Sequence, residues 1–308
     1  MTDIICLGEA MVEFNQQPDG RYLSGFGGDT SNVAIAAARQ GASVGYLTHI
    51  GADPFGQALQ ALWTAEGVDT TTVFENPQAA TGIYFVTHGP DGHAFSYFRT
   101  GSAASCMTPA DLPATALRSA KVLHVSGISQ AISASAADTV FAAIEQVKAA
   151  GARVSYDTNL RLNLWPLARA RAVIHAAVAQ SDIVLPGYDD AVALTGCTEP
   201  DAIADFYLRL GPTIVALTLG ADGVLIATPH DRARVSALPV DAIDATGAGD
   251  TFDGAFLARL VAGDDPATAA CYANAAAALS TTGYGAVAPM PTRAAVLARR
   301  SDQDGRAV

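Results

Sequence analysis

The chain has 308 residues, and 50% of them are hydrophobic, which is enough to bury a large core in one domain or in a domain with a subdomain. Its 18 Lys and Arg against 30 Asp and Glu give a formal net charge of -12, which argues against a nucleic-acid-binding role. Residues 1–12 lack the features of a signal peptide, and no apolar run could cross a bilayer, so we expect a soluble cytoplasmic protein without membrane partners.

The first hundred residues predict two β-hairpins set among β-α units. Period-2 alternation and the GPDG turn indicate hairpins, and apolar residues spaced for one helix face indicate helices. The expected elements are strands at 4–7 and 43–50, helices at 33–41 and 55–66, and hairpins at 11–26 and 81–99.

From Lys121 onward, strands and helices alternate, which predicts a mainly parallel sheet covered on both faces. Two further strands and a helical segment to about residue 299 follow, whereas residues 301–308 have no apolar face and should fray. The expected strands are at 122–127, 153–157, 182–187, 213–220, 223–228 and 233–240, and the expected helices before residue 211 are at 133–150, 167–180, 189–196 and 200–210.

The stretch DAIDATGAGDTFDG, residues 241–254, indicates a flexible turn that opens directly onto a helix. The first N–H groups of a helix and the positive end of its dipole stabilise an anion, and glycines let the backbone approach it closely. The expected anion is a phosphate. The stretch does not match GxxxxGK[ST], so it is not a Walker A loop.

Asp250 stands within this stretch, although a carboxylate beside a phosphate site repels the ligand. One interpretation is that it accepts the proton of an attacking hydroxyl while the helix N–H groups hold the charge on the transferred phosphoryl group. The other is that it is an ordinary acid at a helix start, where a negative charge is favourable. The residues alone leave both open.

Two blocks, GGDTSNVAIAAARQGASVGYLTHIGADPFG and DATGAGDTFDGAF, resemble the two signatures of the ribokinase-like carbohydrate kinases, the PfkB family. The resemblance covers nearly the whole chain. It implies an α/β fold, a ribokinase-like parallel-sheet sandwich with a small β-sheet lid. The lid would arise from segments at about 10–28 and 80–104 of a single domain spanning 1–308, and it would pair with its twin in a homodimer or higher homo-oligomer.

The resemblance also implies roles for individual residues in ATP-dependent phosphorylation. Asp250 would be the catalytic base, Gly247, Ala248 and Gly249 would supply the anion hole, and Asp244 would help shape the turn. Mg²⁺ would bridge the phosphates, and a monovalent cation such as K⁺ would be a further cofactor. The nucleotide-binding residues would be Thr218, Gly220, Gly223, Thr246, Gly247, Gly249 and Asn274.

One implied role, that of Asn274, has an alternative, and the metal-binding motif departs from the family pattern. Asn274 would lie near the adenine, but it could equally be a polar cap in an Ala-rich helix. The NxxE motif of the family falls on Gly187 to Asp190, so its Asn is absent and its Glu is shortened to Asp. Asp190 is therefore the candidate that would order the water shell of the metal.

Two arginines suggest the substrate, because a kinase for a sugar acid must neutralise a carboxylate. Arg99 in SYFRTGSAAS and Arg161 in DTNLRLNLW resemble stretches of the 2-keto-3-deoxygluconate kinase branch, which implies phosphorylation of 2-dehydro-3-deoxy-D-gluconate to its 6-phosphate. By that resemblance the sugar acid would be bound by Gly28, Asp29, Asn32, Tyr84, Tyr97, Arg99, Asn159, Arg161 and Asp250.

Other interpretations remain open for the substrate. Either arginine alone could be a surface residue, and the two tyrosines could be core aromatics of the lid sheet. A kinase for a neutral sugar such as fructose, tagatose or ribose is the nearest alternative. A non-catalytic sensor of sugars or nucleotides is a more distant one, which the intact GAGD stretch disfavours.

Overall fold

The computed structural model describes residues 2–89 and 92–304, and within these ranges the strands form a nine-stranded sheet and a four-stranded sheet. Most pairs in the large sheet are parallel, while its last two strands in sequence pair antiparallel. Its strand order is β13 (Arg232–Val235), β12 (Val224–Ala227), β11 (Ile214–Thr218), β10 (Ile183–Leu185), β9 (Arg153–Asp157), β8 (Val122–Ser126), β1 (Ile4–Leu7), β4 (Val44–Gly51) and β5 (Val73–Asn76).

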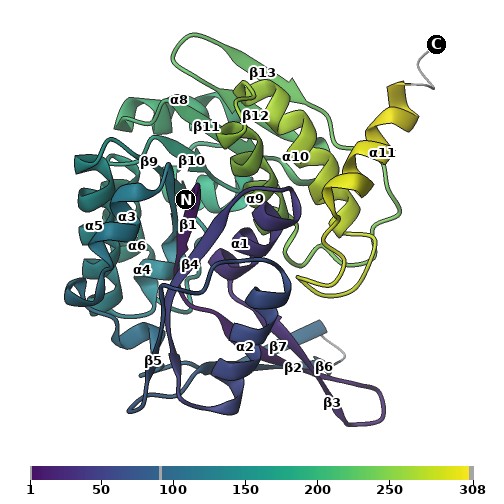
Figure 1. Cartoon of the computed structure of the whole chain (residues 1–308). Coiled ribbons are helices and arrows are strands. Elements are labelled where there is room, and N and C mark those ends of the chain that lie inside the picture. The colour runs from purple at the N-terminus through teal and green to yellow at the C-terminus, as the bar shows by residue number, and fades with distance from the viewer. Residues whose placement is uncertain (1, 90–91, 305–308) are drawn as a thin grey trace.

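Helices cover both faces of the large sheet, because successive strand residues point to opposite sides. In β1, Ile4 and Cys6 join one hydrophobic core and Ile5 and Leu7 join the other. The first core includes α1 (Asp29–Arg39), α2 (Pro54–Ala65), α9 (Ala248–Val261), α10 (Pro266–Ser280) and α11 (Arg293–Asp304). The second includes α3 (Ala114–Ser119), α4 (Gly127–Ala131), α5 (Ala134–Ala149), α6 (Leu167–Val178), α7 (Tyr188–Thr195) and α8 (Pro200–Leu210). Figure 1 shows these two helical layers on either side of the sheet.

The four-stranded sheet projects from one end of this sandwich (Figure 1). Both segments predicted to form a lid contribute to it, and the two hairpins join through a parallel pair, β2 with β6. Its strand order is β3 (Tyr22–Gly27), β2 (Met11–Gln16), β6 (Gly82–Gly89) and β7 (Gly92–Phe98). We call it the small sheet.

Most predicted elements are confirmed, and the differences have physical reasons. The α/β fold with a mainly parallel, doubly covered sheet is as predicted. β5 was not predicted, because its exposed Phe74 and Glu75 break the alternation expected of a half-buried strand. The six-residue α3 was also missed, since it is too short for a periodic pattern.

Two further outcomes concern the chain ends and turns. The prediction that residue 301 begins a frayed tail was wrong for four residues, because α11 continues to Asp304, and residues 305–308 lie outside the described part of the chain. Residues 90 and 91, in the predicted GPDG turn, also lie outside it. Among the residues described, no helix combines the length and apolar character needed to span a membrane.

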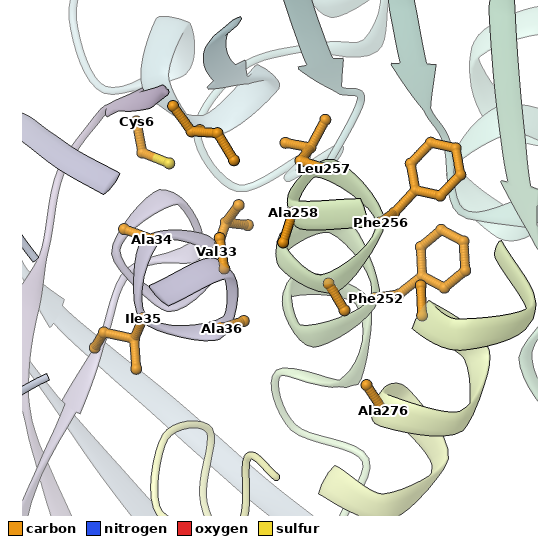
Figure 2. Packing of buried hydrophobic residues seen from close by; sticks show 14 of the residues in the cluster. Cys6, Val33, Ala34, Ile35, Ala36, Phe252, Phe256, Leu257, Ala258 and Ala276 are labelled. Carbon is orange, nitrogen blue, oxygen red and sulfur yellow. The ribbon is translucent and has the colours of Figure 1, made fainter. Parts of the chain in front are cut away.

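Helices α1 and α9 pack closely, and this contact positions the site described below. Gly254 makes it possible, because a Cβ there would stand 2.5 Å from the Val33 carbonyl oxygen and 2.6 Å from the Ala36 Cβ. Figure 2 shows Val33 pointing from α1 towards α9, with Phe252 and Phe256 on the far side of α9. The two helices are therefore held at a separation that admits no side chain at Gly254.

Candidate active site

The turn before α9 has the geometry that the sequence predicts. Gly247 precedes the helix with φ 74°, a left-handed conformation that favours glycine. Asp244 fixes the turn, since its Oδ1 accepts from the N–H of Thr246 (2.9 Å) and from its hydroxyl (2.6 Å). The N–H of Ala248 donates to the Ala245 carbonyl (3.1 Å). A Cβ on Gly249 would meet nothing within 4 Å, so the approach to this N-terminus is open.

Asp250 does not act as a cap of its own helix. Its Oδ2 accepts a hydrogen bond from Nδ2 of Asn32 on α1, at 2.8 Å, across 218 positions of sequence. Asp265 shows the contrast, because it caps α10 by accepting from the N–H groups of Ala267 and Thr268, both at 3.0 Å. The geometry thus favours a role for the Asp250 carboxylate beyond stabilising the helix start.

The pKa of Asp250 is raised to about 7. Burial is the largest cause and the negative charge of Asp29 adds to it, while the Asn32 hydrogen bond and the Arg161 charge oppose the shift. Burial and neighbouring carboxylates also raise the pKa of Asp157 and of Asp253 well above the ordinary range. An Asp with a pKa of about 7 is a stronger base than one with the ordinary value, and a large fraction of it is still ionised at neutral pH.

This shift predicts how activity depends on pH. A carboxylate that acts as a base must be ionised. With Asp250 in the predicted role of base, we expect kcat/KM to rise by about tenfold per pH unit below pH 7 and to level off above it. Asp29→Asn should move the midpoint to lower pH, because it removes a charge that raises the pKa of Asp250. A midpoint that stays in place in this variant would belong to a substrate group instead and would contradict the assignment.

The loop after β9 places several polar groups beside α1 and α9. Asn159 has φ 23°, a strained value for a residue other than glycine, and its Nδ2 donates to Oδ2 of the buried Asp29 at 2.8 Å. Oδ2 of Asp190 accepts from the N–H of Leu160 at 2.8 Å, so Asp190 holds this loop. Arg161 is exposed and donates to the Leu160 carbonyl at 2.9 Å.

The charge of Arg161 reaches both Asp190 and Asp250, and it lowers the pKa of each carboxyl group. For Asp190, burial raises the pKa and is the larger effect. No carboxylate forms an ion pair with Arg161 within residues 2–89 and 92–304. Its guanidinium is therefore available to an anionic ligand at the edge of the site.

Arg99 lies in a different setting. Its guanidinium forms an ion pair with Glu9, a residue that is only 1% exposed, and Ser102 donates a hydrogen bond to the same carboxylate. A Cβ on Gly28, which has φ 111°, would collide with the Glu9 carbonyl oxygen. Glu9 thus lies between β1 of the large sheet and β2 of the small sheet, and its carboxylate neutralises Arg99.

The two tyrosines belong to the small sheet. Tyr84 is buried and donates to Oε2 of Glu13 at 2.6 Å, and the close approach of its hydroxyl to Gly27 leaves no room for a side chain there. Tyr97 is partly exposed, and its ring centroid lies 5.6 Å from that of Tyr84. Tyr84 is close enough to Asp250 for that charge to raise its pKa.

Two of the predicted nucleotide-binding residues, Gly223 and Asn274, contact a second segment, residues 235–241. The N–H of Thr218 donates to the Pro186 carbonyl (2.9 Å), and Gly223 packs so tightly on the Val235 carbonyl that no Cβ fits. Gly220, with φ 59°, has open space around it. Nδ2 of Asn274 donates to the Ser236 carbonyl at 2.6 Å.

A groove of about 520 Å³ opens beside this segment. The groove lies near the turn before α9. The N–H groups of Ile243 and Asp244 in that turn donate to the carbonyl of Thr281, at 2.7 and 3.1 Å, and the next residue, Thr282, lines the groove. No local pattern in the sequence indicates this groove, because its walls come from three separated segments. It is lined by Pro239, Val240, Asp241, Leu279, Thr282 and Arg299.

The structure therefore brings Asp250, Asn32, Asp29 and Asn159 into one hydrogen-bonded and electrostatic cluster, with Arg161 beside it. Sequence reasoning missed Glu9 and Asp157. Asp157 could have been found, because it ends a strand directly before the Asn159 loop. In the described part of the chain no three His, Cys, Asp or Glu side chains gather closely enough to hold a metal ion.

Comparisons with known proteins agree with this geometry. The profile described as pfkB family carbohydrate kinase matches residues 1–293. The chain is 34% identical to 2-dehydro-3-deoxygluconokinase of Thermoproteus tenax over 290 residues, 91% of this chain and 88% of that protein. It is 33% identical to fructokinase-1 of Oryza sativa subsp. japonica over 314 residues, 96% of each chain.

A solved structure is similar as well. A fructokinase double mutant from Vibrio cholerae O395, crystallised with fructose, ADP and a potassium ion, superposes with a TM-score of 0.87 and 32% sequence identity, covering 96% of this chain and 98% of that one. Fold, site and matches together define a sugar kinase. The chain belongs to the pfkB family of carbohydrate kinases.

Proposed function

We propose that this kinase transfers the γ-phosphoryl group of ATP to the terminal hydroxyl of a sugar acid, 2-dehydro-3-deoxy-D-gluconate, giving the 6-phosphate. The observation that carries the proposal is the exposed Arg161 guanidinium, a cation with no carboxylate partner in the described chain, beside the Asp250 cluster. A carboxylate of the substrate would complete this pair through two parallel hydrogen bonds. The similarity to 2-dehydro-3-deoxygluconokinase of Thermoproteus tenax supports the same substrate.

In this proposal Asp250 accepts the proton of the terminal hydroxyl as its oxygen bonds to phosphorus. Asn32 holds the carboxylate in place through its 2.8 Å hydrogen bond. The free N–H groups at the start of α9, those of Gly249 and Asp250, stabilise the charge on the transferred group, whereas the Ala248 N–H must first release the Ala245 carbonyl to join them.

The remaining residues would bind the two substrates. Tyr84 and Tyr97 would offer the small sheet as one wall of the sugar site, with Asn159, Asp29 and Gly28 forming the opposite wall. The groove beside residues 235–241 would take the nucleotide base, with Thr218, Gly220, Gly223 and Asn274 shaping that side of the site.

Magnesium would enter with the nucleotide phosphates, because the described residues offer no cluster of three metal-binding side chains. It would neutralise phosphate charge, and Asp190, whose Oδ2 holds the Leu160 N–H, would contact its water shell. A monovalent cation such as K⁺ would be a further cofactor.

Assembly through the small sheet is a separate part of the proposal. Tyr22, Leu23 and Phe98 on that sheet are exposed, and large exposed apolar side chains that gather on one sheet mark an interaction surface. We expect a homodimer or higher homo-oligomer in which the small sheet contacts its copy, with residues 1–308 of each chain acting as one domain.

A neutral-sugar kinase is the second candidate, and one observation favours it. Arg99, the other arginine expected to bind a carboxylate, is already neutralised by Glu9. Among the described residues, the site then holds one available cation and many hydrogen-bonding acids and amides, which suit a sugar such as fructose. Fructokinase-1 of Oryza sativa is about as similar to this chain as the sugar-acid kinase is.

The deciding measurement is ATP-dependent turnover of 2-dehydro-3-deoxygluconate, fructose, tagatose and ribose by the wild type and by Arg161→Ala. We expect the sugar acid to give the highest kcat/KM, and Arg161→Ala to raise its KM by about 10- to 100-fold with little change in the KM for ATP, because a charge-assisted bidentate pair is lost. Equal increases in both KM values, or a clear preference for fructose, would reject the sugar acid.

A further inference from the structure

A loop between α10 and α11 packs against the turn 244–247, which precedes α9 and is proposed to bind phosphate. Ala286 of this loop packs against Gly247, where a Cβ would lie 3.0 Å from the Ala286 Cα. The N–H of Gly285 donates to Oδ2 of Asp244 at 2.9 Å, and Oδ1 of the same carboxylate holds Thr246. The position of residues 281–291, which we call the backing loop, therefore sets the position of the turn that leads into α9.

Two consecutive residues at the end of α1 clamp the backing loop. Nη1 of Arg39 donates to the carbonyls of Val287 (2.9 Å) and Met290 (2.6 Å). Nε2 of the buried Gln40 donates to the Pro291 carbonyl at 2.8 Å, and its Oε1 accepts from the hydroxyl of Tyr272 at 2.7 Å. Three carbonyls of one loop are thus held by a single helix end.

The carboxylate of Glu66 completes the clamp. Nε of Arg39 donates to its Oε2 at 2.8 Å and Nη2 to its Oε1 at 2.7 Å, a bidentate pair in which both side chains are mostly buried. This pair fixes the plane of the guanidinium, so that Nη1 faces the backing loop. A Lys could replace the charge, but it has no rigid fork with which to hold Glu66 and two carbonyls together.

We infer that Arg39, with Glu66 and Gln40, is a positioning residue for phosphoryl transfer, acting through the backing loop on the turn 244–247. Helix α1 carries Asn32, which holds Asp250, near one end and the Arg39 clamp at the other. Helix α1 therefore positions both Asp250 and the turn 244–247. The inference rests on the proposed role of the start of α9 in binding the transferred phosphoryl group.

The test compares the wild type with Arg39→Gln, Arg39→Lys and a matched control, Arg259→Gln. Arg259 forms an equally bidentate pair with Asp264 (2.7 and 2.8 Å), and its side chain is 21% exposed against 17% for Arg39, but it donates to no carbonyl of the backing loop. Kinetic constants are measured with the sugar that the wild type phosphorylates fastest, and ADP affinity is measured by calorimetry.

We expect Arg39→Gln to lower kcat by about tenfold or more and to raise the nucleotide KM and the ADP dissociation constant, with the sugar KM nearly unchanged, because small displacements of a catalytic group are costly. Arg39→Lys should shift the same constants less. Arg259→Gln should lose thermal stability by a similar amount and change the kinetic constants much less, because its guanidinium reaches the clamp only through the face of the Tyr272 ring, 5.4 Å from the ring centroid.

The inference is overturned if Arg39→Gln changes the kinetic constants no more than Arg259→Gln does, or if the sugar KM moves as far as the nucleotide KM. Should Arg39→Gln fail to fold, Arg39→Lys decides by the same two criteria. A wild type that prefers fructose to the sugar acid would reject the proposed substrate and leave this comparison intact, because it uses whichever sugar is phosphorylated.

Discussion

Asp250→Asn is expected to lower kcat by about 10²- to 10⁴-fold, the range for loss of a general base. The amide keeps the size of the side chain and leaves the N–H groups at the start of α9 in place, so ADP affinity should stay the same or increase as a negative charge leaves the phosphate site. Steady-state kinetics and a calorimetric titration with ADP measure the two quantities. Activity close to that of the wild type would remove Asp250 from the mechanism.

Asp265→Asn is the matched control for this variant. Asp265 also begins a helix, but its carboxylate caps the N–H groups of Ala267 and Thr268, whereas that of Asp250 accepts from Asn32. The control should lose some stability and retain its turnover. If both variants lost turnover equally, the effect would come from the helix starts rather than from a base.

Arg99→Met is expected to give the largest loss of stability, because it leaves the buried Glu9 without its counterion. Breaking a buried pair by removing one partner typically costs about 3–5 kcal/mol. The pKa of Glu9 is already raised by burial, and Arg99 opposes that shift. Without Arg99, the carboxyl group should take up a proton in the folded state and thereby recover part of the loss.

The sign of this effect is testable by denaturant unfolding at several pH values. In Arg99→Met, the pKa of Glu9 should be higher in the folded state than in the unfolded state. Protonation of Glu9 then stabilises the folded protein at low pH, and this stabilisation is lost as the pH rises through the folded-state pKa. The deficit of Arg99→Met should therefore shrink towards acid pH, and Glu9→Gln combined with Arg99→Met should remove the pH dependence. Lys121→Met, which breaks an exposed pair with Asp3, should have a smaller effect. A constant deficit across pH would contradict this account of Glu9.

The elements of the fold could be predicted because their signals are local. The short apolar run Ile4–Leu7 and the glycines before Asp250 are read from a few neighbours, and the structure places a strand and a helix start there. The edge strand β5 lacks such a pattern, since its two central residues, Phe74 and Glu75, are both exposed, and so it escaped prediction.

The partners of charged side chains could not be predicted in the same way. Asn32 meets Asp250 across 218 positions of sequence, and Arg99, which follows β7 of the small sheet, meets Glu9, which precedes β2. Which acid neutralises which arginine depends on the tertiary fold. The sequence therefore suggested two cations for a substrate carboxylate, whereas the structure leaves only one of the two, Arg161, without a carboxylate partner among the described residues. The raised pKa of Asp250 likewise follows from acids that converge only in the folded chain.

The missing side chain at Gly254 has a consequence for how such kinases diversify. With α1 and α9 in direct contact, Asp250, the proposed proton acceptor, and its amide partner Asn32 are held together, and a change at either residue for a new sugar would disturb the other. Adaptation to a different sugar must then be made in the peripheral strands and in the loop around Asn159. The same pair of helices, α1 and α9, can in this way serve kinases for many different sugars.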